Sequence, residues 1–409
     1  MNDESTQNNG PAAEVPEKQQ FDAWVVHAED SAGLTVGTLA LDKRWLEAFA
    51  SEKATGEILG NDKVGETLAG ATTPMVVASG SWTIEQYAVE AVMEATADCK
   101  PEEVWLPSAP GLPAAPLLCL GTQAAKLLAQ NDGFDLSAGM EQAVAWFEEQ
   151  EDIVVRPLIL EASYWGRVTT AAEAREATWG LLKRLQFRPG GFVAKYLNRP
   201  ISIRMSQHLI DTAVTPNQTT IIAAVLGAIG VAMIWMGGYW WAVTGALLMQ
   251  FSSILDGIDG ELARIRYQTS EFGALLDSVC DEVLNAAIVM AAGAYIVAHQ
   301  GFDWWWFWLG VFGGTMTLVY GLIHWHCKWK HGLGFYWWWK AYKPRRQVQR
   351  NTSLWAYFKK LFWKESVLLI YVLAALFGFM QLLVFASGVM GFITLVLFFI
   401  HIVIKRARW

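Results

Sequence analysis

The chain has 409 residues, of which 53% are hydrophobic, and it carries a net charge of −8 at pH 7. Residues 1–190 hold 13 basic and 29 acidic residues, whereas residues 191–409 hold 18 basic and 10 acidic ones. The acidic first half excludes the basic surface that nucleic-acid-binding domains use, and the apolar stretches of the second half exclude a fully water-soluble fold. We therefore expect an acidic domain followed by a membrane domain, with no nucleic-acid partner.

The first half is predicted to be a cytoplasmic α/β domain. Residues 1–20 are polar and lack the apolar core of a signal peptide, so we expect a disordered tail that stays in the cytoplasm. Residues 21–170 alternate short runs rich in Val, Ile and Leu, such as 74–78 and 153–159, with helical patterns, which predicts a partly parallel sheet. Residues 171–213 are expected to form connecting and juxtamembrane amphipathic helices, or else a linker helix packed on the soluble domain.

Residues 214–409 are predicted to form an all-α membrane domain. Six stretches each approach the roughly 20 apolar residues that a helix needs to cross a bilayer. They are residues 218–237, 239–261, 272–298, 304–325, 365–385 and 387–404. The connection 326–364 holds ten basic residues and no acidic one, which by the positive-inside rule places it and both termini in the cytoplasm. We therefore expect an integral six-span bundle in a bacterial or archaeal-type inner membrane.

Four aspartates lie within the second and third predicted spans or at their ends. Asp256 and Asp259 are three residues apart and Asp277 and Asp281 are four apart, so each pair lies on one face of its helix. Because a short turn joins the two helices, antiparallel packing brings both pairs to the same depth. Carboxylates inside a bilayer need a cavity, a partner or a metal, and clustered oxygen ligands favour hard ions. The sequence therefore predicts a site for two Mg²⁺ or Mn²⁺ ions.

The spacing of these aspartates also belongs to a longer motif. Residues 256–281 read DGIDGELARIRYQTSEFGALLDSVCD, which fits the pattern D-x2-D-G-x2-A-R-x8-G-x3-D-x3-D at every fixed position. This motif, placed on the second and third of six spans, resembles that of the CDP-alcohol phosphotransferases, also called CDP-alcohol phosphatidyltransferases. The resemblance implies a membrane enzyme of phospholipid or related phosphodiester biosynthesis. Such an enzyme moves a phosphoalcohol group from a CDP-alcohol to an alcohol or a phosphorylated polyol and releases CMP.

The resemblance further implies roles for individual residues. Asp256, Asp259, Asp277 and Asp281 match the metal ligands, and Asp281 also matches the residue that takes the proton of the acceptor. Seven other residues match positions that contact the nucleotide part of the donor or let the two helices approach: Asn217, Thr220, Gly260, Ala263, Arg264, Ser270 and Gly273. The expected cofactors are two Mg²⁺ or Mn²⁺ ions, and the expected assembly is a homodimer among membrane lipids.

The first half carries a shorter similarity of its own. Residues 164–177 and 192–203 are similar to the junction in fused di-myo-inositol-phosphate-phosphate synthases, in which a nucleotidyltransferase precedes the membrane domain. Here the Gly-rich loop of the nucleotidyltransferase is missing, and Arg167 and Thr169 stand where its acidic residues belong. The resemblance implies a degenerate nucleotidyltransferase-like domain without cytidylyltransferase activity, and an unrelated α/β accessory domain is the alternative.

The substrates and two rival functions stay open at this point. Lys359, Lys360 and Lys364 are candidates for binding a phosphorylated acceptor, with Lys195 and Arg199 as further ones, but such residues also follow the positive-inside rule and contact lipid phosphates. The expected donor is CDP-diacylglycerol or a CDP-inositol-like compound. A divalent-cation carrier would also use intramembrane carboxylates, and a non-catalytic membrane scaffold would keep the same fold.

Overall fold

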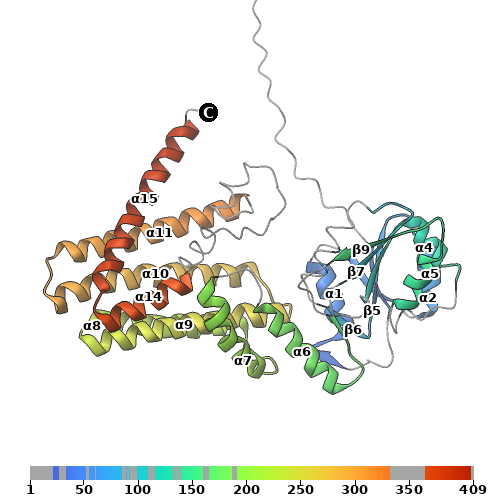
Figure 1. Ribbon diagram of the computed structural model, residues 1–409, viewed down its shortest axis with the longest axis horizontal. Coiled ribbons are helices and arrows are strands. Elements are labelled where there is room, and N and C mark those ends of the chain that lie inside the picture. Colours follow the sequence, from blue (N-terminus) through green and yellow to red (C-terminus); the bar gives the residue numbers. More distant parts are fainter. Residues whose placement is uncertain are drawn as a thin grey trace, which may run out of the picture. The chain divides into compact units, whose positions relative to one another are not determined.

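The chain folds into two compact units, Met1–Leu181 and Leu182–Trp409 (Figure 1). The computed structural model describes residues 22–26, 34–51, 55–59, 61–84, 89, 92, 99–108, 116–131, 136, 140–159, 165–186, 191–331 and 364–406. The expected tail, residues 1–20, and two of the candidate acceptor lysines, Lys359 and Lys360, lie outside these described residues.

The first unit is built on a six-stranded mixed sheet. In spatial order its strands are β4 (Thr55–Leu59), β1 (Asp22–Val26), β5 (Met75–Ser79), β8 (Leu117–Leu120), β7 (Glu103–Ser108) and β9 (Val154–Ile159). Strand β1 pairs in parallel with β4 and β5, and β7 pairs in parallel with β9, whereas β8 runs antiparallel to both of its neighbours. Every residue of β5 and β8 is buried, as expected for strands covered on both faces.

Helices cover the sheet on both sides. Helices α2 (Asn61–Ala69), α4 (Thr122–Leu128) and α5 (Glu141–Glu148) lie over one face, and α1 (Leu41–Ser51) lies on the other (Figure 1). The core under the three helices is apolar and includes the fully buried Phe147. The prediction of an α/β first half with a partly parallel sheet is therefore confirmed.

The remaining elements of the first unit are short pairs of strands and one long helix. Strands β2 (Thr35–Val36) and β3 (Leu39–Ala40) form one antiparallel pair, and β6 (Trp82–Ile84) and β10 (Trp165–Arg167) form another. They are followed by α6 (Ala171–Leu185). This helix begins with a reciprocal cap, because the Glu173 carboxylate accepts the Thr170 amide at 3.2 Å and the Glu173 amide donates to the Thr170 hydroxyl at 3.2 Å.

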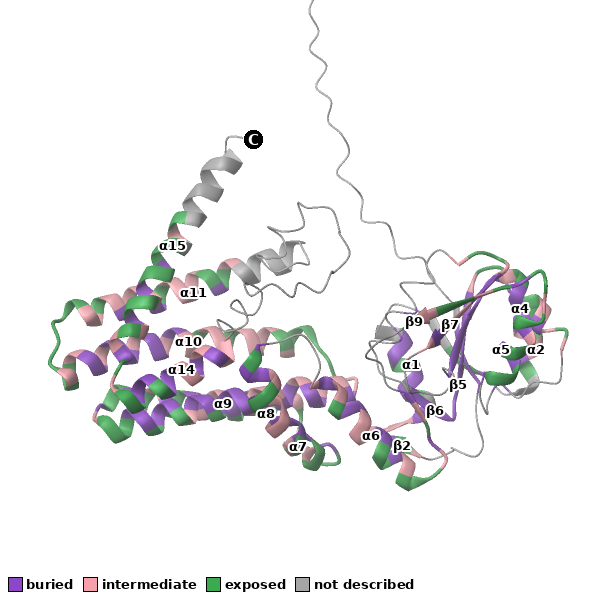
Figure 2. Cartoon of the chain, viewed as in Figure 1, coloured by how far each residue is buried: buried purple, intermediate pink, exposed green. Residues whose placement is uncertain are grey.

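The second unit consists of helices. In chain order they are the π-helical turn η3 (Ala194–Asn198), α7 (Arg199–Leu209), α8 (Pro216–Met236), α9 (Tyr239–Ile265), α10 (Glu271–Gln300), α11 (Trp305–His331), α14 (Lys364–Phe377) and α15 (Met380–Arg406). Within the described part of the chain, four helical segments are long and apolar enough to cross a membrane, namely α8, α9, α10 and residues Trp305–Ile323 of α11. Large apolar side chains face outwards on them, for example Trp240 with 73% of its surface exposed. These outer positions are green in Figure 2.

The last two predicted spans differ from the structure in their bounds. The sequence predicts one span over 365–385 and the next over 387–404, but the helix break lies at Gly378, between α14 and α15. Gly378 has a φ of +77°, a backbone conformation that glycine adopts without a steric cost. Helix α14 therefore has 14 residues, and at 1.5 Å per residue it is shorter than the roughly 30 Å apolar core of a bilayer.

Small residues bring the long helices into close contact. A Cβ atom on Gly230 of α8 would lie only 2.7 Å from the carbonyl oxygen of Gly245 on α9. A Cβ atom on Gly293 of α10 would similarly lie 3.1 Å from the Cα atom of Gly310 on α11. Such backbone-to-backbone packing is typical of helices that associate in membranes. It brings α8 against α9 and α10 against α11. Helices α8, α9 and α10 carry most of the predicted site residues.

Candidate active site

The site is built around the tight turn that joins α9 to α10. The Gln268 amide donates to the Ala263 carbonyl at 2.8 Å, and Tyr267 adopts a φ of +53°, so the chain reverses within a few residues. Ser270 then caps α10, because its hydroxyl accepts the Gly273 amide at 3.0 Å. The carboxyl end of α9 therefore lies beside the amino end of α10, and the two halves of the motif meet.

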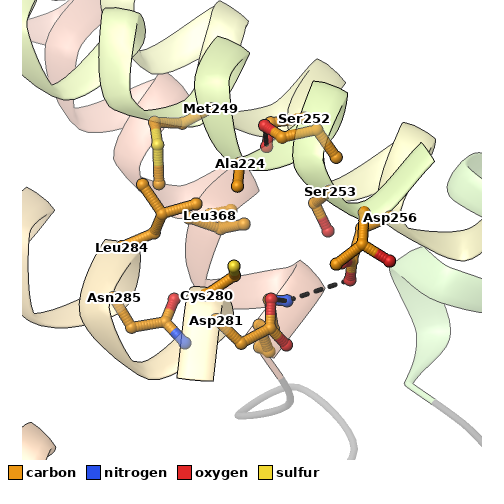
Figure 3. Close-up of a pocket in the computed structure, with 13 residues that line it drawn as sticks. Ala224, Met249, Ser252, Ser253, Asp256, Cys280, Asp281, Leu284, Asn285 and Leu368 are labelled. Atoms are coloured by element: carbon orange, nitrogen blue, oxygen red, sulfur yellow. Dashed lines mark hydrogen bonds and ion pairs between the residues drawn. The ribbon is translucent and has the colours of Figure 1, made fainter. Parts of the chain in front are cut away.

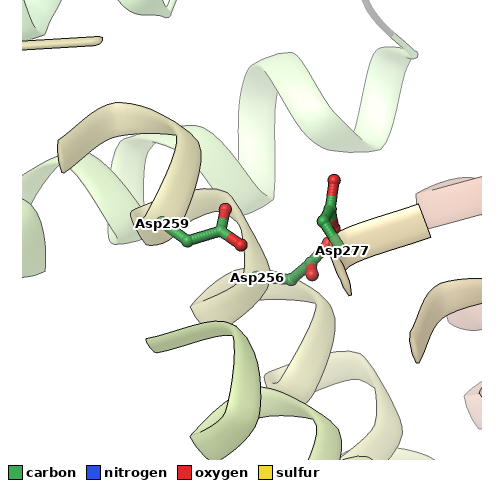
Figure 4. Close-up of side chains that lie close together, drawn as sticks. All are labelled: Asp256, Asp259 and Asp277. Carbon is green, nitrogen blue, oxygen red and sulfur yellow. The ribbon is translucent and has the colours of Figure 1, made fainter. Parts of the chain in front are cut away.

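Three of the four predicted metal ligands converge at this point. Asp256 and Asp259 on α9 and Asp277 on α10 each offer a carboxylate oxygen, and these oxygens lie within 4.8 Å of one another (Figure 4). Asp259 is 9% exposed and is held in place by the Thr220 hydroxyl and the Gly260 amide, both of which donate to its carboxylate. A set of three carboxylates around one small volume fits a hard divalent cation.

The fourth predicted ligand, Asp281, lies beside the three but has a different partner. Its carboxylate forms an ion pair with the ammonium group of Lys364, the first residue of α14. The same ammonium group lies 3.2 Å from Oδ2 of Asp256. Figure 3 shows Asp256 and Asp281 on the two sides of the pocket where these contacts meet. Lys364 therefore contacts both Asp281 and Asp256, a member of the three-aspartate cluster.

A cleft opens next to the three carboxylates. It has a volume of about 170 Å³. All seven residues predicted to contact the donor line it: Asn217, Thr220, Gly260, Ala263, Arg264, Ser270 and Gly273. Asp259 and Asp277 complete its wall, so the structure brings these predicted residues into one concave surface that ends at the acid cluster.

Two glycines keep this cleft open. A Cβ atom on Gly260 would lie 2.9 Å from both terminal nitrogens of the Arg264 guanidinium. A Cβ atom on Gly273 would lie 3.0 Å from the Asn217 side-chain oxygen and from the Ser270 hydroxyl. Larger residues at these positions would therefore displace the polar groups that line the cleft.

A second cavity adjoins the acid cluster. Its volume is about 150 Å³, and Asp256, Arg264 and Arg199 line it, together with Glu261 and Glu365. Of the candidate acceptor residues, Arg199 therefore lies at this cavity and Lys364 lies at the aspartates. Lys195, the remaining described candidate, lies with its ammonium group 5.4 Å from the centre of the Tyr196 ring.

Two charged residues within the motif segment hold helix α7. Glu261 is 3% exposed, and its two carboxylate oxygens accept the hydroxyls of Ser202 and Ser206 on α7, each at 2.6 Å. The Arg266 guanidinium donates to four carbonyl oxygens at and after the end of α7: those of Leu209, Ile210, Thr212 and Val214. Arg266 is therefore engaged by backbone carbonyls at the end of α7.

Sequence reasoning missed the contacts of Lys364 with Asp256 and Asp281. Lys364 is separated from Asp256 by 108 positions, so no helical spacing relates the two residues. One signal was available, since Lys364 directly precedes a predicted span at the side expected to be cytoplasmic, and the motif is expected at the same side. The contact of Glu261 with α7 was also not predicted, because Ser202 and Ser206 lie 59 and 55 positions away from it in the sequence.

The first unit carries no comparable cluster within its described residues, since the described part of the chain has one group of three or more metal-ligating side chains, formed by Asp256, Asp259 and Asp277. Thr169, which stands at a position expected to be acidic, donates its hydroxyl to Glu173 at 2.9 Å. The buried Glu103 forms an ion pair with Arg156 at 2.8 Å. Thr169 and Glu103 are therefore both engaged in contacts that stabilise the fold.

Parts of the chain are similar to known proteins. Residues 213–400 match the family model of the CDP-alcohol phosphatidyltransferases. A protein of Aquifex aeolicus named bifunctional IPC transferase and DIPP synthase is 32% identical over 208 residues, which cover 47% of this chain and 47% of that protein. Phosphatidylinositol phosphate synthase of Corynebacterium glutamicum is 36% identical over 91 residues, which cover 22% of this chain and 40% of that protein. The match thus spans less than half the length of each of these two relatives.

A solved structure also aligns with the chain. The crystal structure of Mycobacterium tuberculosis phosphatidylinositol phosphate synthase with CDP-DAG bound is 21% identical, with a TM-score of 0.34. The alignment covers 48% of this chain and 92% of that chain.

The segment matched by the family model, residues 213–400, includes the four aspartates, the seven cleft residues and Lys364.

Proposed function

We propose that the protein is a membrane transferase that moves a phosphoalcohol group from a CDP-alcohol to an alcohol or a phosphorylated polyol and releases CMP, since residues 213–400 match the family model of the CDP-alcohol phosphatidyltransferases. One observation carries this proposal. The motif carboxylates converge at the end of a cleft of about 170 Å³ that all seven predicted donor-binding residues line. A cleft of this kind suits a polar, phosphate-bearing ligand that ends at a cation site.

The acid cluster would hold the divalent cations of this reaction. Asp256, Asp259 and Asp277 would bind one Mg²⁺ or Mn²⁺ ion, and Asp281 together with Asp256 would contribute to a second. Bound ions of this type neutralise a pyrophosphate and stabilise the oxygens that attack and leave the phosphorus. Oxygen ligands are the type that these two metals prefer.

The cleft residues would bind and orient the donor. The Arg264 guanidinium offers a planar set of donors to a phosphate, and Gly260 leaves room for it. Asn217 and Thr220 lie in the first turns of α8, at the wall of the same cleft. The cytidine diphosphate part of the donor would occupy this cleft, with its pyrophosphate at the aspartates.

The transfer itself would use Asp281 as the base. The hydroxyl oxygen of the acceptor forms a bond to the phosphorus on the alcohol side of the donor, and the bond from that phosphorus to the CMP oxygen breaks. The hydroxyl proton passes to the Asp281 carboxylate, and CMP leaves with the electron pair of the broken bond. Asp281 lines the pocket beside Asp256, which supports a base at the same end of the site as the proposed cation ligands.

A phosphorylated polyol is the acceptor class that we favour. Lys364 places a positive charge between Asp256 and Asp281, and Arg199 lines the second cavity next to Asp256. Both cations could pair with an acceptor phosphate. The name of the Corynebacterium glutamicum relative, phosphatidylinositol phosphate synthase, supports a polyol phosphate as the acceptor. CDP-diacylglycerol or a CDP-inositol-like compound is the proposed donor.

We also propose a six-span layout with both termini in the cytoplasm of a bacterial or archaeal-type cell, and a homodimeric assembly. The four long apolar helices and the shorter apolar segment Met380–Ile393 support the membrane placement. Helix α14 has only 14 residues, so in this layout the residues that flank it would complete its span. The basic residues of 326–364 support the orientation, because such residues favour the cytoplasmic side. Labelling of single cysteines from either side of the membrane tests the layout; labelling of residue 409 from outside the cell would contradict it.

The test of the transferase proposal is CMP release by the purified full chain in Mg²⁺. We would supply CDP-diacylglycerol and CDP-inositol in turn, each with inositol phosphate, glycerol phosphate or inositol. Asp256→Asn and Asp281→Asn should each reduce CMP release at least 100-fold, whereas the exposed Asp303→Asn should keep it within twofold. Unchanged turnover in Asp281→Asn would refute the assigned base.

The same preparation separates the rival functions. Uptake of Mn²⁺ into liposomes without any CDP-alcohol would identify a divalent-cation carrier. Absence of both CMP release and uptake with every donor would indicate a scaffold without catalysis.

A further inference from the structure

Two cysteines of the first unit come from separate segments and lie next to each other. Cys119 is on β8 and is fully buried, whereas Cys99 is half-buried and comes just before the turn that leads into β7. The Cys119 thiol donates a hydrogen bond to the Cys99 sulfur. Neither cysteine belongs to a disulfide, so two thiols are in contact here.

The backbone around the two cysteines holds their segments together. The Glu103 carbonyl oxygen accepts the Gly121 amide at 2.9 Å and lies 3.7 Å from the Cys99 sulfur. Gly121 lets the segment after Cys99 pack closely on the end of β8, because a Cβ atom at this glycine would lie 2.5 Å from the Pro101 carbonyl oxygen. Since the two sulfurs are within hydrogen-bond reach, closing them to the roughly 2.05 Å of a disulfide bond needs side-chain rotation rather than a rearranged sheet.

We propose that Cys99 and Cys119 are a modification site, at which hydrogen peroxide or a related hydroperoxide converts the two thiols into a reversible disulfide. Disulfides in reducing compartments are usually transient and act in redox sensing. The bond would join β8 to the segment that enters β7, its antiparallel neighbour. The proposal concerns the first unit and does not depend on the transferase function.

The oxidation takes place in two steps. The Cys99 thiolate attacks one oxygen of hydrogen peroxide, the O–O bond breaks, and hydroxide leaves while Cys99 becomes a sulfenic acid. The Cys119 sulfur then forms a bond to the Cys99 sulfur, and the S–O bond of the sulfenic acid breaks. The proton of the Cys119 thiol passes to the departing hydroxyl, which leaves as water. Two electrons are thereby transferred from the thiols to the peroxide.

Exposure and charge give the two cysteines different roles. Cys99 is the thiol that a peroxide reaches from solvent, because the Cys119 side chain is 0% exposed. The hydrogen bond from Cys119 lowers the pKa of Cys99 below its ordinary value of 9.0, although burial and the carboxylates of Glu103 and Glu102 act in the opposite direction. A lower pKa favours the thiolate, which is the reactive form. Cys119 is already in contact, so it resolves the sulfenic acid before a second oxidation.

Peptide mapping of the full-length chain in detergent tests the proposal. The chain is reduced, desalted, treated with hydrogen peroxide, alkylated with N-ethylmaleimide and digested with Glu-C. This protease cuts after glutamate, so cleavage at Glu102 or Glu103 separates Cys99 from Cys119. We expect a pair of peptides linked through the two cysteines, with loss of alkylation at both. Dithiothreitol should restore the alkylation.

Three variants locate the linkage. Cys99→Ser should abolish the linked pair, and Cys119→Ala should stop the reaction at the Cys99 sulfenic acid, which dimedone labels. The matched control Cys280→Ser removes a half-buried thiol of the second unit and should keep the pair. A wild type in which peroxide produces no linked pair, or oxidises Cys99 beyond the sulfenic acid while Cys119 is still alkylated, would overturn the proposal. The wild-type map needs no variant, so it decides even where a variant aggregates in gel filtration.

Discussion

Gly260 illustrates how a single hydrogen atom in place of a side chain shapes the candidate site. It follows Asp259 directly and faces the Arg264 guanidinium, with both residues on the wall of the same cleft. The helix there has ordinary geometry, so glycine is not needed for the backbone. Glycine is needed here because a side chain would not fit: the guanidinium nitrogens lie 2.9 Å from the position of a Cβ atom.

Gly260→Ala should therefore weaken donor binding without unfolding the bundle. The added methyl group displaces the Arg264 guanidinium, which then loses hydrogen bonds to the phosphate of the CDP-alcohol. This loss weakens binding by about 2 kcal/mol, which corresponds to a roughly 30-fold higher KM for the CDP-alcohol. The measurement is KM and kcat for CMP release, with the melting temperature in detergent as the stability check. Gly257→Ala is the matched control, since its Cβ atom would meet the Ser202 hydroxyl at 3.3 Å, outside this cleft, and its KM should stay within threefold.

Glu103 shows a charged residue used for stability in the first unit. It is 3% exposed, and its carboxylate accepts the Lys100 amide at 3.3 Å and the Trp105 indole N–H at 3.2 Å in addition to the ion pair with Arg156. Burial alone raises the pKa of Glu103, but these donors and the Arg156 guanidinium together hold the pKa below its ordinary value of 4.5. Glu103 is therefore a stabilising anion at neutral pH.

This depressed pKa predicts the pH dependence of the first unit. A carboxyl group with a folded-state pKa below its unfolded-state value contributes stability above pH 4.5, and this contribution is lost as the pH falls through the folded-state pKa. Glu103→Gln should cost about 2 kcal/mol at pH 7 and should flatten the decline of stability below pH 4.5. Calorimetry of the full chain between pH 3 and pH 7 measures both, with Glu102→Gln as the neighbouring control; an unchanged profile in Glu103→Gln would contradict the assignment.

At the scale of elements, α7 is held to α9 by polar contacts. Glu261 is the residue after Gly260, and its buried carboxylate receives two hydroxyls of α7 at 2.6 Å. Arg266, at the end of α9, donates to the carbonyl oxygens that follow α7, for example that of Thr212 at 3.0 Å. These contacts fix α7 against the part of α9 that carries the motif, and α7 contributes Ser202 to the second cavity.

Glu261→Ala should loosen this connection. It removes both acceptors and leaves two buried hydroxyls, on Ser202 and Ser206, without their present partner, at a cost of about 2 kcal/mol. The melting temperature in detergent should fall, and protease cleavage between α7 and α8 should become faster. Gln207→Ala, an exposed change on the same helix, should alter neither, and an unchanged cleavage rate in Glu261→Ala would argue against the proposed connection.

Hydropathy predicts where long apolar helices lie, but not how they break or pack. The stretches that became α8, α9 and α10 are long and apolar and are bounded by polar or glycine residues, so their positions were predicted to within a few residues. The break at Gly378 was missed because both flanks are equally apolar, and only its φ of +77° distinguishes it. The motif spacing predicted that the two aspartate pairs face each other, but no pattern could reveal Lys364, whose position depends on how α14 packs on α9.

At the scale of the whole molecule, the two units divide structural and chemical roles. Among the described residues, the four motif aspartates, the cleft beside them and Lys364 all belong to the second unit, whereas the first unit presents a sheet with buried strands. In the first unit, Thr169 binds Glu173, and no group of three or more metal-ligating side chains occurs among its described residues. The interpretation of this unit as a nucleotidyltransferase-like fold without activity stays a prediction.

This division predicts that the full chain cannot make its own CDP-alcohol. With CTP, inositol phosphate and Mg²⁺, we expect no CDP-inositol and no pyrophosphate above the background of the heat-inactivated protein. The reason is that nucleotidyl transfer needs a cation site at the nucleotide phosphates, and Arg167 and Thr169 cannot supply carboxylate ligands. Supplied CDP-alcohols should still release CMP in the same preparation, which is the control for an intact protein. Formation of CDP-inositol that persists in Asp281→Asn would assign that activity to the first unit and refute the prediction.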